Sequence, residues 1–203
     1  MSVVHLIDTL TEWARQNICE HILLKQPPAN VDPNDEGYSY EEVNPTAFPM
    51  YIPTSEKLPP GIHSPFPSLC VRFLNGADTL ADNEGGVEVQ FCFSAWNPGT
   101  HGRDVFHPAG DGSFVRQGAV YAEYERNADG WRDVWNFVDI ALRAVESASI
   151  IGEYTIDRAA PVKYGPLVEQ EAIADYYPLW FAWISFRVTY PLRRNIPDIN
   201  KYL

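Results

Sequence analysis

The fold is decided by the stretch WRDVWNFVDIALRAVESAS, which covers residues 131–149. Its apolar residues recur at steps of three and four, as they do on one face of an α-helix. Asn127 or Asp129 is a suitable N-cap, and Gly152 can adopt the left-handed conformation that ends many helices. We therefore expect a helix that packs on a β-sheet and buries its apolar face, which includes Trp131, Trp135, Val138, Leu142 and Val145.

Four stretches around this helix predict the strands of that sheet. Residues 86–95 read GVEVQFCFSA and alternate apolar and polar residues, which is typical of a strand with one buried face. A polar, turn-rich connection joins them to residues 68–75 and predicts an antiparallel hairpin. Residues 178–192 are apolar on both faces near their start, which predicts a central strand. Residues 154–164 carry Pro161 and are expected at an edge.

A second helix is expected near the N-terminus, over residues 2–25, with Ser2 as its cap. Residues 165–177 are interpreted as a loop or a brief helix. The sequence thus predicts a single α+β domain over residues 1–203. Its mixed, mainly antiparallel sheet has about four strands, and two helices pack on one face.

Two long irregular segments interrupt this pattern. Residues 27–67 contain ten prolines, yet aromatic residues are interleaved among them, unlike in a disordered linker. We interpret the segment as a Pro-rich arm that lies on its own domain or on a neighbouring subunit, with a short strand near residues 47–52. Residues 97–130 form a Gly-, His- and Asp-rich loop insertion, in which residues 115–124 are a short strand or a helical turn.

Bulk properties narrow the function classes. The chain has 203 residues and a net charge of −12, which disfavours general nucleic-acid binding and anionic membrane surfaces. The longest strongly apolar run, residues 178–184, is too short to span a bilayer. The N-terminus has no secretion-signal pattern. Three widely spaced cysteines indicate a reducing compartment without a disulfide framework.

The most prominent candidates for chemistry lie in the loop insertion and are His101, Asp104, His107 and Asp111. Their spacing matches no established zinc or calcium motif. Cys92 is a candidate nucleophile only if His101 or His107 lies beside it, and the phosphate-loop and Gly-x-Ser-x-Gly patterns are absent. We expect no catalytic residue, no cofactor and no bound metal, and therefore no enzyme.

Aromatic residues outside the expected core are the candidates for a subunit interface, because such residues are enriched there. The candidates are Tyr38, Tyr40, Phe48, Tyr51, Tyr176, Tyr177 and Trp180. An acidic cluster in the Pro-rich arm, residues 32–42, is either a solvated surface or a docking element for a basic patch.

The order of helix, hairpin, helix and closing strand resembles the small tail-terminator or tail-completion proteins of long-tailed bacteriophages. The resemblance rests on element order and on no specific motif. Its stretches are residues 3–25, 68–95, 131–149 and VKYGPLVEQEAIADYYPLWFAWISFRVTYPL at 162–192. The Pro-rich arm and the loop insertion depart from the compact pattern of that family.

The resemblance implies a structural virion protein without catalytic residues. It would form a homo-oligomeric ring, commonly a hexamer, that caps the tail and joins it to the head. Its partners would be further copies of itself, the tail tube protein and the head connector proteins, at the head–tail junction of a phage or prophage particle made in the host cytoplasm. In such a ring the sheet edge and the Pro-rich arm are the expected contact surfaces. Two alternatives stay open: a small soluble binding module, or a metal-dependent enzyme that uses residues 97–112.

Overall fold

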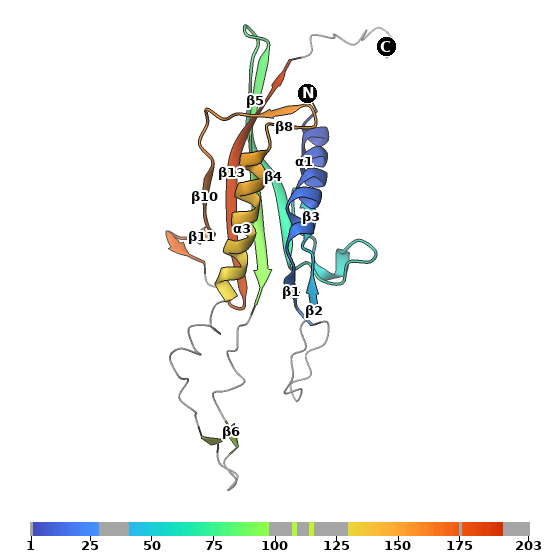
Figure 1. Cartoon of the computed structure of the whole chain (residues 1–203), viewed down its shortest axis with the longest axis vertical. Coiled ribbons are helices and arrows are strands. Elements are labelled where there is room, and N and C mark those ends of the chain that lie inside the picture. The colour runs from blue at the N-terminus through green and yellow to red at the C-terminus, as the bar shows by residue number, and fades with distance from the viewer. Residues whose placement is uncertain are drawn as a thin grey trace.

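The computed structural model describes residues 2–28, 41–97, 107–108, 114–115, 130–174 and 176–192, with backbone only for 107–108 and 114–115. Its main element is a seven-stranded sheet with the path β3-β4-β5-β13-β9-β8, in which β10 also pairs with β13 (Figure 1). The strands are β3 (Thr46–Pro49), β4 (Ser68–Thr79), β5 (Glu84–Trp96), β8 (Ile150–Ile151), β9 (Tyr154–Ile156), β10 (Lys163–Pro166) and β13 (Leu179–Pro191). The helices are α1 (Val3–Asn17) and α3 (Gly130–Ser147).

The predicted α+β class is confirmed, and the sheet is larger than expected. Only β3 and β4 run parallel, and the other pairs of this sheet are antiparallel. The added strands come from β3, from β8, and from the division of residues 154–164 into β9 and β10. These two strands pair with different parts of β13, so the chain between them, with Pro161, leaves the sheet.

Both helices lie on the same face of the sheet, which we call the inner face (Figure 1). The Trp13 ring of α1 lies 6.3 Å from Phe91, and the Phe137 ring of α3 lies 4.9 Å from Phe93. Phe91 and Phe93 are two residues apart on β5 and therefore point to one side. The predicted alternation is confirmed along β5 and β13, whose inner residues are buried as far as Tyr190, although Trp180 is only half-buried.

The buried face of α3 is rotated relative to the prediction. Trp131 is 43% exposed, with the Arg132 guanidinium 5.2 Å from its ring centroid. Trp135 and Leu142 are half-buried, so the expected full burial of these three residues was wrong. Phe137 lies at the centre of the contact, and a tryptophan at the helix edge can bury one side of its ring and leave the other in water. The fully buried residues are Gly130, Val134, Phe137, Val138, Ala141 and Val145.

Gly152 does not end this helix, which stops at Ser147. It lies with φ +60° in the turn between β8 and β9, where a Cβ atom would come 2.7 Å from Thr9 Cγ2 of α1. Glycine is required there both by the backbone angle and by the close approach of the first helix.

The first helix is shorter than predicted. Ser2 caps its start, as expected, because Ser2 Oγ accepts a hydrogen bond from the His5 backbone N–H at 3.4 Å. The helix ends at Asn17 and passes into the 3₁₀ turn η1 (Cys19–His21) and the strand β1 (Leu24–Gln26). The Asn44 amide then donates to the carbonyl oxygens of Cys19 and Ile22 at 3.1 and 2.8 Å, which holds the turn in place.

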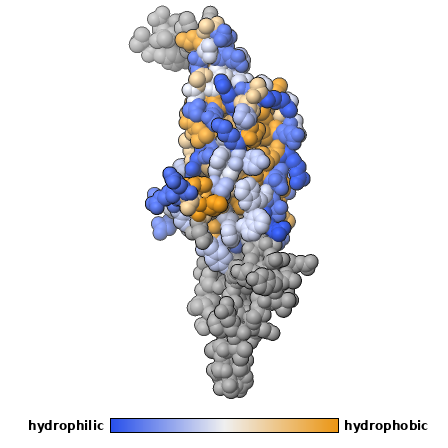
Figure 2. All heavy atoms as spheres, turned by 90° about the vertical axis from the view of Figure 1, so that its left-hand side faces the viewer, coloured by the Kyte–Doolittle hydropathy of each residue, from blue (hydrophilic) through white to orange (hydrophobic). Residues whose placement is uncertain are grey.

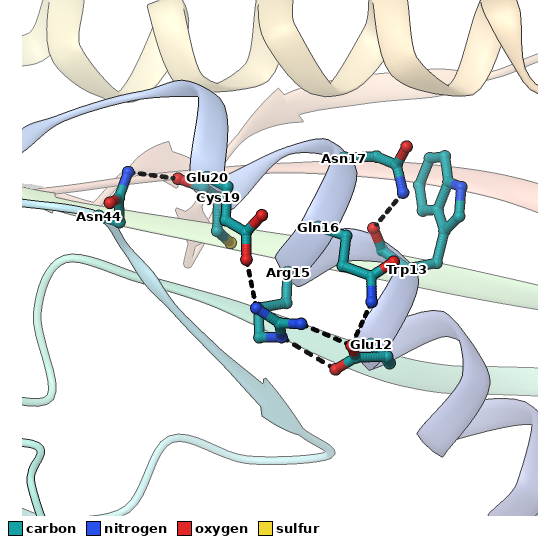
Figure 3. Close-up of polar contacts among 8 residues, drawn as sticks. All are labelled: Glu12, Trp13, Arg15, Gln16, Asn17, Cys19, Glu20 and Asn44. Carbon is teal, nitrogen blue, oxygen red and sulfur yellow. Dashed lines mark hydrogen bonds and ion pairs between the residues drawn. The ribbon is translucent and has the colours of Figure 1, made fainter.

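An exposed ion-pair network covers the last turns of α1 (Figure 3). Arg15 binds Glu12 and Glu20, and the Gln16 amide donates to Glu12. The hydrogen bonds from Arg15 lower the pKa of Glu12. Such exposed pairs contribute little to stability, so we regard the network as a solvated surface.

The described residues of the Pro-rich arm belong to the domain itself. Strand β2 (Glu41–Val43) pairs with β1, β3 joins the main sheet, and η2 (Ser55–Lys57) precedes the return to β4. The short strand expected near residues 47–52 is thus confirmed as β3, Thr46–Pro49. Residues 41–67 thus lie on their own domain, which is the first of the two expected alternatives, and residues 29–40 lie outside the described residues.

Residues 165–177 were expected as a loop or brief helix and instead contain a small β-hairpin. It consists of β11 (Val168–Glu169) and β12 (Ala172–Ile173), and it projects from the side of the sheet (Figure 1). Within the loop insertion, β6 (His107–Pro108) pairs with β7 (Phe114–Val115), whereas residues 98–106, 109–113 and 116–129 lie outside the described residues.

Candidate interaction surfaces

Exposed apolar side chains concentrate between residues 162 and 177. Of the fifteen exposed large hydrophobic residues among the described ones, six lie in this stretch: Val162, Tyr164, Val168, Ile173, Tyr176 and Tyr177. Figure 2, which looks onto this side of the molecule, shows hydrophobic atoms next to strongly hydrophilic ones. Single exposed apolar residues are ordinary, but a concentration of this kind makes the stretch a candidate interaction site.

The β11–β12 hairpin is the centre of this concentration. Val168 and Ile173 face each other across the hairpin and are 53% and 71% exposed. The turn residues Gln170 and Glu171 have φ angles of +49° and +67°, the left-handed pair that a type I′ turn needs. Asn-Gly is the usual choice there, so this turn carries backbone strain and two long polar side chains instead.

Three predicted interface residues adjoin the hairpin. The Tyr176 ring lies 5.9 Å from Phe181, and a hydrogen bond with Glu169 raises the pKa of Tyr176. The Tyr177 ring lies 6.3 Å from Trp180. Tyr176 and Tyr177 are exposed, as an interface role requires. Trp180 is half-buried and donates its indole N–H to the Asn97 carbonyl oxygen at 2.9 Å, so part of its role is internal.

The other four predicted interface residues are not part of the group beside the hairpin. Phe48 is 4% exposed and lies on β3 opposite Cys70, so its prediction as an interface residue was wrong: the parallel strand buries it within the chain. Tyr51 follows the same strand and is 67% exposed. Tyr38 and Tyr40 lie outside the described residues.

A polar clamp joins β1, the end of β5 and α3 at one end of the sheet. Lys25 Nζ donates to Asn97 Oδ1 at 3.2 Å, and Asn97 Nδ2 donates to Asp133 Oδ2 at 2.7 Å. Burial raises the pKa of Asp133, while the Asn97 hydrogen bond and the Lys25 charge oppose that shift. A Cβ atom on Gly130 would lie 2.3 Å from the Asn97 carbonyl oxygen, so the two ends of the loop insertion touch. The clamp therefore fixes where the insertion leaves and rejoins the domain.

The face of the sheet opposite the helices, the outer face, carries polar residues. Strand register places Arg72, Gln90, Ser185 and Lys163 in one row across β4, β5, β13 and β10. The adjacent row contains Asn75, Glu88 and Arg187. These strands are distant in the sequence, and only their pairing brings the basic residues together.

A groove of about 220 Å³ lies on this outer face. Arg187 crosses Gly86, where a Cβ atom would come 2.5 Å from the guanidinium, and its carboxylate neighbour is Asp157 Oδ2 at 3.7 Å. Asn75 donates to Glu88 at 3.0 Å. The groove thus has two cations beside an apolar wall, and its lining residues are Asn75, Ala77, Gly86, Glu88, Ala160, Pro161, Lys163, Phe186 and Arg187.

Proline blunts two edges of the sheet. On β3, the Thr46 amide donates to the carbonyl oxygen of Pro67, just before β4, and the Met50 amide donates to that of Val71 in β4. Pro49 therefore faces outward, away from β4. On β10, the Leu167 amide donates to Phe181 of β13, which places Pro166 outward. Proline offers no N–H to a neighbouring strand. The expectation that a sheet edge forms a subunit contact is therefore weakened, and side-chain surfaces are favoured.

The chemical candidates receive little support from geometry. His101, Asp104 and Asp111 lie outside the described residues, and His107 is described only in its backbone. The part of the chain that the structure describes contains no group of three residues suited to hold a metal ion. The three cysteines are free, and burial raises the pKa of Cys19 to about 12 and that of Cys92 to about 11. A thiol that stays protonated at neutral pH is a poor nucleophile.

Neither the β11–β12 hairpin nor the groove was predicted from the sequence. The alternation of Val168, Glu169, Ala172 and Ile173 was a signal for the hairpin, but Gln170-Glu171 is not a turn-forming pair. The groove had no local signal, because its residues come from four strands and from the connection between β9 and β10.

No family model and no curated protein matches this chain. Neither described helix is long and apolar enough to cross a membrane.

Proposed function

We propose that this chain is a structural subunit of a bacteriophage particle that completes or caps the tail and joins it to the head connector as part of a homo-oligomeric ring. The observation that carries the proposal is the concentration of exposed apolar residues at 162–177, beside an otherwise ordinary buried core. An interaction surface of this kind needs a protein partner. The order of elements, with two helices on one face of a mainly antiparallel sheet, supports the resemblance to tail-completion proteins.

Two further features fit a subunit that meets its partners through side chains. The net charge of −12 keeps free subunits apart and favours basic patches on tail or connector proteins. Two proline-blunted sheet edges prevent uncontrolled strand pairing between copies. Contacts in a ring are heterologous, which requires two different surfaces on each subunit. The exposed hairpin and the outer face are two such surfaces.

The direct test inactivates the gene in the phage or prophage that carries it and examines the particles by electron microscopy. We expect separate heads and tails, or tails of irregular length, and recovery when the intact chain is supplied in trans. Normal joined particles without the protein would overturn the proposal. Purified protein that carries one zinc ion per chain, lost when His101 and His107 are replaced together, would favour the metal-dependent alternative.

A narrower deletion tests the role of the Pro-rich arm. Removal of residues 30–60 would also delete β2 and β3, including the buried Phe48, and leave β4 without its neighbouring strand, so it would disrupt the edge of the sheet. Replacing only residues 29–40 by a short Gly/Ser linker keeps the β1–β2 pairing, in which Gln26 lies opposite Glu41. We expect this variant to fold with an unchanged unfolding midpoint but to complete tails poorly. Full complementation by this variant would show that the segment has no assembly role.

A further inference from the structure

We propose that the β11–β12 hairpin of one subunit docks into the outer-face groove of a second copy of this chain. As a ring contact, this inference rests on the proposed function, whereas the pairing of the two surfaces can be measured on the isolated protein. The hairpin exposes both apolar and acidic side chains. Val168 and Ile173 expose an apolar pair on one face of the hairpin, and Glu171 adds a carboxylate at its turn. Glu169 lies on the opposite face and is hydrogen-bonded to Tyr176. Glu171 sits at the strained turn and makes no hydrogen bond or ion pair with the described residues.

The groove presents the complementary chemistry. Lys163 is exposed and Arg187 is half-exposed, and their cationic groups adjoin the apolar wall of Ala77, Ala160 and Pro161. Arg187 Nε lies 3.7 Å from Asp157 Oδ2, which is longer than a hydrogen bond. The guanidinium group can therefore bind a closer carboxylate through two parallel hydrogen bonds. Glu88, the acidic residue within the groove, is held by Asn75.

The local charge also differs from that of the whole chain. Three basic residues (Arg72, Lys163 and Arg187) and two acidic ones (Glu88 and Asp157) occupy this part of the outer face. The chain as a whole has 15 basic and 27 acidic residues. Because both copies are acidic, most of their surfaces repel each other. The groove, by contrast, attracts an acidic element of another copy through its basic residues.

The hairpin cannot reach the groove of its own chain. Lys163 stands at one end of β10 and the hairpin begins just beyond Pro166 at the other, roughly 10 Å away at the usual rise per strand residue. Pairing of β10 with β13 fixes that separation. Docking of the hairpin into this groove therefore requires a second copy, and each subunit offers both surfaces, as a closed ring requires.

A contact this small is weak between two isolated subunits and becomes strong only when a ring closes and several contacts hold at once. The experiment therefore traps it covalently. Equal amounts of ¹⁴N- and ¹⁵N-labelled full chain, at the highest soluble concentration, are treated with a carbodiimide. The reagent converts a carboxylate into an O-acylisourea, an adjacent amine attacks the acyl carbon to form an amide bond, and the carbodiimide leaves as its urea. Mass spectrometry of the digest should find mixed-isotope peptides that join Glu169 or Glu171 to Lys163.

Charge reversal provides the decisive comparison. The double variants E169K/E171K and K163E/R187E should each lose the mixed-isotope crosslink and associate about tenfold more weakly in sedimentation equilibrium. A mixture of the two variants should restore a crosslink between positions 169 or 171 of one and position 163 of the other. The matched controls are D139K/E146K and K57E/R143E, which change exposed residues far from both surfaces by the same charge and should behave as wild type. Circular dichroism confirms that all variants fold.

The outcomes separate the inference from the proposed function. A wild-type crosslink that avoids these residues, an association constant that both reversals leave unchanged, or no recovery in the mixture would each overturn the inference. Loss of the crosslink in variants that still complete tails would leave the pairing intact and remove its role in the ring. Loss of tail completion on gene inactivation, without any 169/171–163 crosslink, would support the proposed function and refute this contact.

Discussion

The two faces of the sheet are built from the same strands and differ in almost every physical respect. On β5, Val87, Val89, Phe91 and Phe93 point to the inner face and are fully buried under the helices. Their neighbours Glu88, Gln90 and Cys92 point to the outer face and are half-buried. The inner face is a continuous apolar core, whereas the outer face combines buried hydroxyls, cations and a groove. The inner face therefore stabilises the fold, and the side chains of the outer face remain available for binding.

The largest expected effect comes from breaking the inner face. Replacing Phe137 by Ala should lower the free energy of unfolding by about 3–5 kcal/mol, because it opens a cavity against Phe93. Replacing Leu142 by Ala on the same helix should cost clearly less, since that side chain is only half-buried. Chemical denaturation of both variants gives the comparison. Equal losses would contradict the rotated face of α3.

A smaller effect is expected from the buried hydroxyl pair of the outer face. Ser68 Oγ and Ser94 Oγ lie 2.7 Å apart, and Ser94 Oγ also donates to the Ser68 carbonyl oxygen at 3.2 Å. Replacing Ser94 by Ala should cost about 1–3 kcal/mol, because it leaves the buried Ser68 hydroxyl without its acceptor and the Ser68 carbonyl oxygen without this donor. Replacing Ser68 by Ala should cost less, since Ser94 keeps its bond to the carbonyl.

The double variant S68A/S94A sharpens this comparison. Its loss of unfolding free energy should be smaller than the sum of the two single losses, because no unpaired hydroxyl remains. Urea denaturation measures all three variants. Strict additivity would show that the two hydroxyls act independently.

The smallest expected effect concerns pH at the polar clamp. Burial raises the pKa of Asp133 above its ordinary value of 3.8. The folded state then holds a proton that the unfolded chain has already released. The contribution of this group to stability is therefore complete below pH 3.8 and is lost as pH rises through the folded pKa. The variant D133N should remove that decline while Asn97 keeps a hydrogen-bond acceptor.

Denaturant midpoints of wild type and D133N, measured at a series of pH values from 3 upward, check the sign. The wild-type midpoint should fall relative to that of the variant as Asp133 ionises. A relative rise over the same interval would mean that the Asn97 and Lys25 interactions outweigh burial.

The seven interface candidates differ in their exposure, for a physical reason. Tyr51, Tyr176 and Tyr177 are exposed as an interface requires, whereas Phe48 was wrong because β3 joins the sheet beside β4. The local sequence around an aromatic residue in a proline-rich segment does not show whether that segment pairs with another strand. Its burial depends on a partner strand twenty residues away, which local patterns do not specify.

The sequence by itself determined the α+β class, both helices, the 68–95 hairpin and the inward residues of the two longest strands, because hydrophobic periodicity is a local property. It also determined the Ser2 cap. Only the tertiary structure decided which face of α3 is buried, since Phe137 packs against Phe93 while Trp131 lies at the exposed edge of the contact. It likewise decided the groove, because strand register brings Asn75, Glu88, Lys163 and Arg187 together from β4, β5, β10 and β13. Register is a long-range property, and no single stretch of this chain contains it.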